Sequence, residues 1–337
     1  MSRLLKWDGT EMDFVSNLTL RAMRMLFSTW TNHLAVGLSA ALWLGRGSPP
    51  VKVNKWLVGG CCASYAWRVF CAHAGGHRYF AHLSFQTTKW FEMMMALTIQ
   101  ASASNENIVY WINFHEFHHM SCETEEDPHS PHHLGFWAVQ TMDSSARLVT
   151  TREGVERLFR TDLLEHRFKN NLVWLRNWQL EIKLAEHAFW LLAGPSAVFW
   201  MVSIPTMGHF HAIRLTNSAA HLWGYMPYEA QFQRVCKATN CWWVALINGG
   251  EGWHNNHHAF MGSAKHGFMW WEFDWVYVGL RMLGQLGVVW DIKVPTDDVL
   301  AARYSTLPKH RLNIRRLYRL ECPAADLKKG KADVRAL

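Results

Sequence analysis

The chain has 337 residues, half of them hydrophobic, and contains 20 histidines and 20 tryptophans. Its mean hydropathy is nevertheless −0.11, so the apolar residues must be concentrated in segments of an otherwise polar chain. The formal net charge is +7, but no nucleic-acid recognition motif accompanies it, which argues against a nucleic-acid partner. The length suits one large domain or two small ones.

The N-terminal segment does not have the pattern of a secretory signal. Asp8, Glu11 and Asp13 lie within its first residues, and no early apolar run occurs there. The same acidic residues argue against a transit peptide, which is normally poor in them.

Three apolar windows follow in chain order, at residues 25–45, 56–76 and 187–213. The second holds one charged residue, Arg68, and the other two hold none. A bilayer core needs roughly 20 apolar residues per helix, so each window is long enough to cross. The alternative is a set of buried helices in a large soluble protein. Residues 89–111 have too short an uncharged run to cross and favour a helix at the membrane surface, whereas the charge-rich residues 143–186 favour helices outside the bilayer.

The number of crossings follows from four histidine-containing motifs, at residues 77–82, 115–119, 217–221 and 254–258. They can bind metal together only if all of them lie on one side of the membrane. His77 and His115 follow two crossings, so an even number must precede His221. Residues 187–213 are too short to cross twice, and two crossings would have to begin near Leu172. Charged residues would then enter the bilayer, at about 2.5–3.5 kcal/mol each on insertion scales. The sequence therefore predicts four crossings.

The seven cysteines include no CxxC pair, and we expect all of them to be reduced thiols. At the other end of the chain, residues 307–337 hold nine Lys or Arg and three Asp or Glu, so this tail contributes 9 − 3 = +6 to the net charge. Such a basic tail suits anionic lipid headgroups or an acidic protein partner, or it is simply a solvated tail. We expect a single domain over residues 1–306 and a separate tail over 307–337.

Two segments carry the same histidine triplet, HxxHH. On a helix, positions i, i+3 and i+4 share one face, so each triplet directs three imidazoles toward one place. The triplets are His115, His118 and His119 in "WINFHEFHH", and His254, His257 and His258 in "GEGWHNNHHAF".

Two further pairs accompany the triplets. Asn217 and His221, in "NSAAH", are four residues apart and can converge on one face of a helix. His77 and His82, in "HRYFAH", are five apart and would diverge by about 140° on a regular α-helix. They could share a metal only if the helix ends between them.

Neutral imidazole is the commonest metal ligand in proteins and suits iron, copper, zinc and nickel. Nine histidines are too many for one four-coordinate zinc, but they could fill two metal sites with four or five nitrogens each. The bland alternative, surface histidines without a ligand, fits a lone triplet better than four motifs placed beside apolar segments. His73 and His266 are among the histidines that we expect to be ordinary core residues.

In this order the motifs resemble those of the membrane-bound fatty acyl desaturases, in particular the Δ9-type family. The matching pieces are "GGHRYFAH", "WINFHEFHH" followed by "ETEEDPHSP", "NSAAHLWGYMPY", "WWVALINGGEGWHNNHHAF", "SAKHGFMWWEFDW" and "LGVVWDIKVP". The last pieces are most similar to the plant and cyanobacterial branch, and the resemblance covers about residues 30–295.

The resemblance implies an all-helical integral membrane protein, with four transmembrane helices and a cytosolic helical cap that holds two irons. One iron would be held by His77, His82, His115, His119 and His258. The other would be held by His118, His221, His254 and His257, with Asn217 reaching it through a water. The implied reaction inserts a cis double bond, of Δ9 type, into a saturated acyl chain, with consumption of O2 and two electrons.

The same resemblance implies the partners. The substrate would be a fatty acyl-CoA or an acyl-lipid, and the electron donor cytochrome b5 or ferredoxin, because the chain itself has no haem or ferredoxin motif. The expected location is the endoplasmic reticulum, with a plastid or bacterial membrane as alternatives. Glu116 departs from the family pattern, which has Arg at this place in the second motif. Other functions left open are a related di-iron hydroxylase, a sphingoid or sterol desaturase, and a non-enzymatic membrane metal-binding protein.

Overall fold

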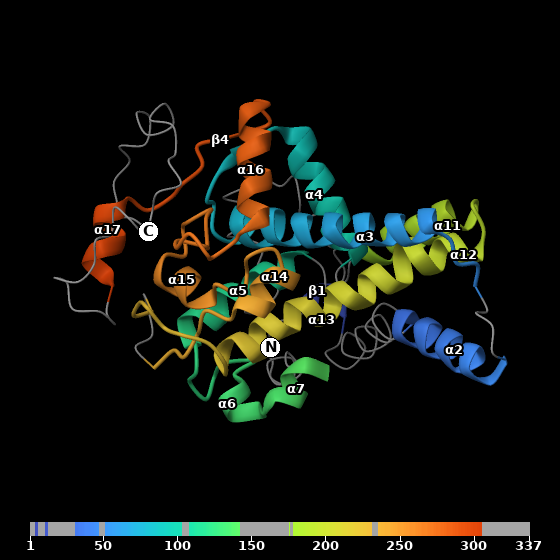
Figure 1. Cartoon of the computed structure of the whole chain (residues 1–337), viewed down its shortest axis with the longest axis horizontal. Helices are drawn as coiled ribbons and strands as arrows, with labels where there is room; N and C mark the ends of the chain where they lie inside the picture. Colours follow the sequence, from blue (N-terminus) through green and yellow to red (C-terminus); the bar gives the residue numbers. More distant parts are fainter. Residues whose placement is uncertain are drawn as a thin grey trace. The chain divides into compact units, whose positions relative to one another are not determined.

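The structure is a computed structural model that describes residues 4–5, 11–12, 31–46, 51–102, 108–141, 175, 178–230 and 235–304. Helices make up most of this described chain, as the sequence predicts (Figure 1). The basic tail 307–337 lies outside the described residues, and so does most of the charge-rich segment 143–186.

The chain divides into two compact units, each assembled from segments that are distant in sequence. Unit 1 consists of Met1–Cys71, Ala96–Phe114 and Ser145–His211. Unit 2 consists of Ala72–Met95, His115–Ser144 and Ala212–Leu337. A single domain over residues 1–306 stays a prediction.

Unit 1 is a helical bundle in which α3 (Lys55–Phe70), α2 (Thr31–Arg46) and α11 (Gln179–Leu191) pack around the π-helical turn η4 (Phe199–Ser203). The short helix α12 (Pro195–Val198) leads directly into η4. Helix α3 begins after Asn54, whose side chain accepts a hydrogen bond from the backbone N–H of Leu57 at 2.9 Å. Strands β1 (Leu4–Leu5) and β2 (Glu11–Met12) pair antiparallel.

A buried arginine crosslinks this bundle. Arg68 lies in α3 and is 3% exposed, and its guanidinium donates hydrogen bonds to Ser102 at 2.8 Å and to Glu186. A guanidinium away from water must be paired in this way, because an uncompensated buried charge is strongly unfavourable. This pairing explains how a charged residue is accommodated in the apolar window 56–76.

Within the described chain, we find no helix that has both the length and the apolar character needed to cross a bilayer. Four crossings therefore stay a prediction.

Four helices continue from the segments of one unit into those of the other along the chain: η2 (Cys71–Ala81), by its first residue, α4 (Lys89–Ser102), α5 (Ile108–Ser121) and α13 (Ile204–Ser218). Unit 2 adds short elements, most of them of only one or two turns. These are α6 (Pro131–Leu134), α7 (Phe136–Thr141), η5 (Ala219–His221), α14 (Trp242–Ile247), α15 (His254–Ala259), α16 (Trp275–Gln285) and α17 (Asp297–Arg303). Strand β3 (Gln86–Thr87) pairs antiparallel with β4 (Val289–Trp290).

Close backbone approaches and polar contacts hold these short elements in place. A Cβ at Gly252 would overlap the backbone nitrogen of Ala245, so only glycine allows the turn before α15 to pack against α14. Asp274 caps α16 by accepting from the backbone N–H of Tyr277 at 2.9 Å. The same carboxylate pairs with Arg78, which is fully buried.

Candidate metal centre

Unit 2 brings all nine motif histidines together as two groups, and within each group the possible ligand atoms lie within 4.8 Å of one another. The first group consists of His77, His82, His115, His119 and His257. The second group consists of His118, His221, His254 and His258.

Each HxxHH triplet is divided between the two groups by its helix. In α5, His115 and His119 belong to the first group and His118 to the second. Residues i and i+4 differ by about 40° around an α-helix, whereas neighbours i+3 and i+4 differ by about 100°. The first and last histidines of a triplet can therefore share a metal, and the middle one points to the other group.

This geometry corrects the expected distribution of the third motif. The resemblance placed His258 with the first set and His257 with the second, but the structure exchanges them. His257 Nε2 lies 2.9 Å from both His77 Nε2 and His119 Nε2. His258 Nε2 lies 3.1 Å from His254 Nε2, its i+4 partner in α15.

The first motif reaches its group through a π-helix, so its two histidines meet without the helix end that a regular α-helix would require between them. Helix η2 continues to Ala81, and the backbone N–H of His82 donates to the carbonyl of His77 at 3.2 Å. This i→i+5 bond is the π-helical pattern, which places residues five apart one turn above each other. The imidazoles of His77 and His82 consequently meet, with ring centroids 5.0 Å apart.

The spacing of the nitrogens fits a bound metal ion. Nitrogens bound at about 2.1 Å, as zinc binds imidazole, lie about 3.0 Å apart at a right angle. In the first group, His82 Nε2 and His119 Nε2 lie 2.8 and 2.9 Å from His115 Nε2. In the second group, His221 Nε2 is buried and has no hydrogen-bond partner among the described residues. Both groups thus have the donors that a metal bound by imidazole requires.

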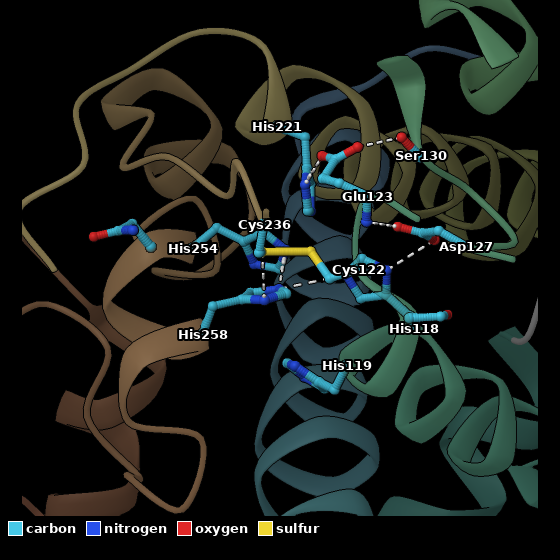
Figure 2. Close-up of a disulfide and its surroundings, with 12 residues drawn as sticks. His118, His119, Cys122, Glu123, Asp127, Ser130, His221, Cys236, His254 and His258 are labelled. Atoms are coloured by element: carbon cyan, nitrogen blue, oxygen red, sulfur yellow. Dashed lines mark hydrogen bonds and ion pairs between the residues drawn. A yellow bond between two sulfur atoms is a disulfide. The ribbon is translucent and has the colours of Figure 1, made fainter. Parts of the chain in front are cut away.

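Buried carboxylates orient three of these histidines from behind. Glu251 Oε2 lies 2.5 Å from His77 Nδ1, Asp127 Oδ1 lies 3.0 Å from His118 Nδ1, and Glu123 Oε1 lies 2.8 Å from His221 Nδ1. A carboxylate on the far nitrogen fixes the ring and its tautomer, with the proton on Nδ1 and the lone pair on Nε2. The last two of these contacts are visible in Figure 2.

Glu251 is itself held by charged groups. The guanidinium of Arg78 donates to Glu251 Oε1 at 2.9 and 3.1 Å. Burial alone would raise the pKa of Glu251, but the charges of His266, His77 and Arg78 outweigh it and hold this pKa well below its usual range. The carboxylate therefore stays ionised beside the first group.

The pKa values of the other two acids move in the same direction. Burial would raise the pKa of Asp127, but the charge and hydrogen bond of His118 hold it far below its usual range. Burial would likewise raise the pKa of Glu123, and the hydrogen bond and charge of His221 lower it. Both acids remain hydrogen-bond acceptors for the second group.

Burial keeps five of the nine imidazole rings neutral. It lowers the pKa of each of the five well below the usual value of 6.5, and neighbouring imidazoles lower it further. These five are His115, His119, His254, His257 and His258. A neutral ring offers a lone pair to a metal, so the site is prepared for coordination rather than for acid–base chemistry.

Asn217 and two other histidines complete the picture. Asn217 lies half-buried in the last turn of α13, and its contact through a water stays a prediction. His73 and His266, which we expected to be ordinary core residues, are buried beside Glu251, at 3.9 and 3.3 Å from its oxygens. The sequence offers no spacing rule that links either of them to Glu251.

The expectation that every cysteine is a free thiol was wrong for two of them. Cys122 and Cys236 form a disulfide between positions 114 residues apart. It lies against the second group, with Cys236 Sγ 3.2 Å from His258 Nδ1 (Figure 2). Four other cysteines of the described chain are free: Cys61, Cys62, Cys71 and Cys241.

Comparison with known proteins identifies the family in which such histidine groups occur. The family model described as "Fatty acid desaturase" matches residues 54–286, which contain all nine histidines. The chain belongs to the fatty acid desaturase family. This match confirms the resemblance seen in the sequence. Members of the family are O2-dependent oxidoreductases.

Several desaturases are about one-third identical to this chain. An Arabidopsis thaliana protein named "Probable lipid desaturase ADS3.2, chloroplastic" is 33% identical over 249 residues, 71% of this chain and 65% of that protein, just under two thirds of its length. An "sn-1 stearoyl-lipid 9-desaturase" of Anabaena variabilis is 36% identical, over 65% of this chain and 77% of that protein. An "Acyl-CoA C20 Delta5-desaturase" of Anemone leveillei is 33% identical, over 70% of this chain and 74% of that protein.

Proposed function

We propose that this desaturase binds one iron in each histidine group and inserts a cis double bond into a saturated acyl chain. The observation that carries the proposal is the convergence of nine histidines in two groups, seven of them buried and two half-buried, in a chain of the desaturase family. The reaction turns –CH2–CH2– into –CH=CH– and, with O2, two electrons and two protons, releases two waters. Iron in these groups would supply the activation of dioxygen that an unreactive methylene needs.

The protein's own residues have three tasks in this proposal. The histidines bind the metals as neutral donors, and Glu123, Asp127 and Glu251 fix their orientation. The burial of the groups excludes water from the reacting centre. Because a methylene has no polar handle, the position of the double bond must be set by how the acyl chain is held.

The substrate that we propose is an acyl-lipid carrying a saturated chain, with desaturation at Δ9. Two of the relatives support this choice, because their printed names specify lipid desaturation and one specifies position 9. The acyl-CoA desaturase of Anemone leveillei supports acyl-CoA as the alternative carrier.

We further propose an integral membrane location in a plastid or bacterial membrane, with the four crossings that the sequence predicts. One relative is named as chloroplastic and another comes from Anabaena variabilis, and neither name supports the endoplasmic reticulum that we first expected. Electrons would come from a separate donor protein, ferredoxin or cytochrome b5.

The test is expression in a yeast strain that lacks its own desaturase, followed by gas chromatography of total fatty acids. We expect a new monounsaturated peak with the wild-type chain and none with His118→Ala. His187→Ala is the matched control, because His187 lies in α11 outside both groups, and we expect it to retain the product. A hydroxylated product, or no product despite two bound metals per chain and both acyl carriers supplied, would contradict the proposal.

A further inference from the structure

The Cys122–Cys236 disulfide joins two segments that lie against the second histidine group. Cys122 directly follows α5, which carries His118, and directly precedes Glu123. Cys236 lies against His258 of α15. Both sulfurs belong to buried residues, 1% and 4% exposed.

Every Nδ1 partner that the structure gives to the second group lies on or beside this crosslink. His118 Nδ1 contacts Asp127, His221 Nδ1 contacts Glu123, and His258 Nδ1 contacts the sulfur of Cys236. Figure 2 shows these contacts around the disulfide. The bond therefore fixes the 122–127 segment, with two orienting carboxylates, relative to the segment that supports His258.

We propose that Cys122–Cys236 is a reversible disulfide crosslink that stabilises the second histidine group, and that its reduction selectively weakens metal retention in this group. The inference rests on the proposed function, since it requires metal in both groups. In the first group, the orienting carboxylate Glu251 is held in place by Arg78, which also pairs with Asp274. This group should therefore respond much less to the same reduction.

The redox step is an ordinary thiol–disulfide exchange. The Sγ–Sγ bond breaks, and two electrons and two protons from a dithiol, itself oxidised to a disulfide, give two cysteine thiols. The thiols can then separate, and the 122–127 segment is no longer tied to the segment beside His258. Loss of the side chains that orient metal-binding histidines typically lowers metal affinity by about 10- to 100-fold.

Linkage makes the coupling reciprocal. If the disulfide favours metal in the second group, that metal must in turn favour the disulfide. The midpoint potential of the Cys122–Cys236 pair should then be more negative in the metal-loaded protein than in the metal-free protein. A tenfold difference in metal affinity corresponds to about 30 mV for this two-electron couple.

The experiment uses the full-length protein in detergent, loaded anaerobically with cobalt(II), whose visible spectrum reports imidazole coordination. Cobalt release to a chelator is followed before and after treatment with a phosphine, which takes up the disulfide's oxidising equivalents as phosphine oxide. Thiol labelling and mass spectrometry of the Cys122 and Cys236 peptides verify the redox state. We expect one of two cobalt equivalents to leave at least about tenfold faster after reduction.

Three variants assign the effect. The double variant Cys122→Ser/Cys236→Ser should release one equivalent rapidly with or without phosphine, which also excludes chelation by the reductant. Cys62→Ser, at an exposed free cysteine, should behave as wild type. His221→Ala should retain one equivalent and lose the phosphine-sensitive phase.

The outcomes separate this inference from the proposed function. One outcome is that the protein binds two cobalt equivalents, that reduction does not change their release rates, and that bound metal does not change the midpoint potential. This result would overturn the redox role of the disulfide and leave the proposed metal sites unaffected. Free thiols at Cys122 and Cys236 under oxidising conditions would do the same. Failure to bind metal in either redox state would overturn both, and simultaneous loss of both equivalents on reduction would show a general structural role instead.

Discussion

The Nε2 atoms of His77 and His257 lie 2.9 Å apart, although 180 residues separate the two histidines in the chain. One comes from the π-helix η2 and the other from the middle position of the HxxHH triplet in α15. This contact places His257 in the first group, where the sequence resemblance had placed His258.

Pairs of substitutions should reveal which histidines share a metal. His77→Ala/His257→Ala removes two ligands of the first group only, so we expect one of two metals to remain per chain. His77→Ala/His258→Ala removes a ligand from each group and should leave none. Metal analysis of the purified proteins measures both; the opposite pattern, with one metal left in the second double variant, would restore the originally expected distribution.

The carboxylate behind His221 should control the affinity of the second group. Glu123→Gln keeps the shape of the side chain but removes the negative charge of the carboxylate, whose Oε1 lies 2.8 Å from His221 Nδ1. We expect metal affinity at this group to fall by about 10- to 100-fold, as measured by competition with a chromogenic chelator. Glu125→Gln is the matched control, because this exposed side chain lies two residues further on and should not change the affinity.

Acid should destabilise the metal-free protein in two steps. Several histidines of the two groups have lowered pKa values in the folded protein. Below about pH 6.5 the unfolded chain therefore binds protons that the folded chain does not, and the stability of the folded state decreases as the pH is lowered. The carboxylates with lowered pKa values, Asp127 and Glu251, lose their contribution in a second and more acidic range, below about pH 4.

Thermal unfolding of the metal-free protein in detergent, recorded from pH 8 down to about pH 2, measures both steps. Bound metal should oppose the first step, because protons and metal compete for the same nitrogens. A melting temperature that stays constant or rises between pH 7 and pH 5 would contradict the neutral state assigned to the histidines.

The turn before α15 should not tolerate a side chain. Gly252→Ala places a Cβ against the backbone of Ala245 and Val244, so α14 and α15 must separate and carry His254 and His258 with them. We expect destabilisation by at least about 2 kcal/mol and loss of metal from the second group. In α3, Gly59→Ala meets nothing within 4 Å and serves as the control, with an expected change within about 1 kcal/mol. Equal melting temperatures for the two variants would refute the close packing at Gly252.

The sequence predicted the nine histidines because a helical triplet is a local pattern, and i, i+3, i+4 spacing is visible without a structure. It did not predict their division between the groups. That division depends on the direction in which α5 and α15 face each other, but the i, i+4 rule already pairs His254 with His258 and could have been applied.

The orienting carboxylates and the disulfide depend on contacts between distant segments. Glu251 meets His77 across 174 residues, and Cys122 meets Cys236 across 114, so no local spacing announces either contact. Arg78 shows the same limit: its position beside His77 gives no hint that it is fully buried between Glu251 and Asp274. Helical character was predictable from the sequence, whereas the π-helical hydrogen bonding of η2 was not.

The π-helix η2 changes how the spacing of the first motif should be understood. A π-turn in an otherwise α-helical segment is equivalent to one additional residue accommodated without breaking the helix. HxxxxH in η2 and an HxxxH pair in a regular α-helix can therefore present two imidazoles in the same way. A search for metal-binding helices that admits only four-residue spacing would overlook such proteins. The number of residues between two histidines therefore indicates the local type of helix, and does not by itself measure how far apart their side chains lie.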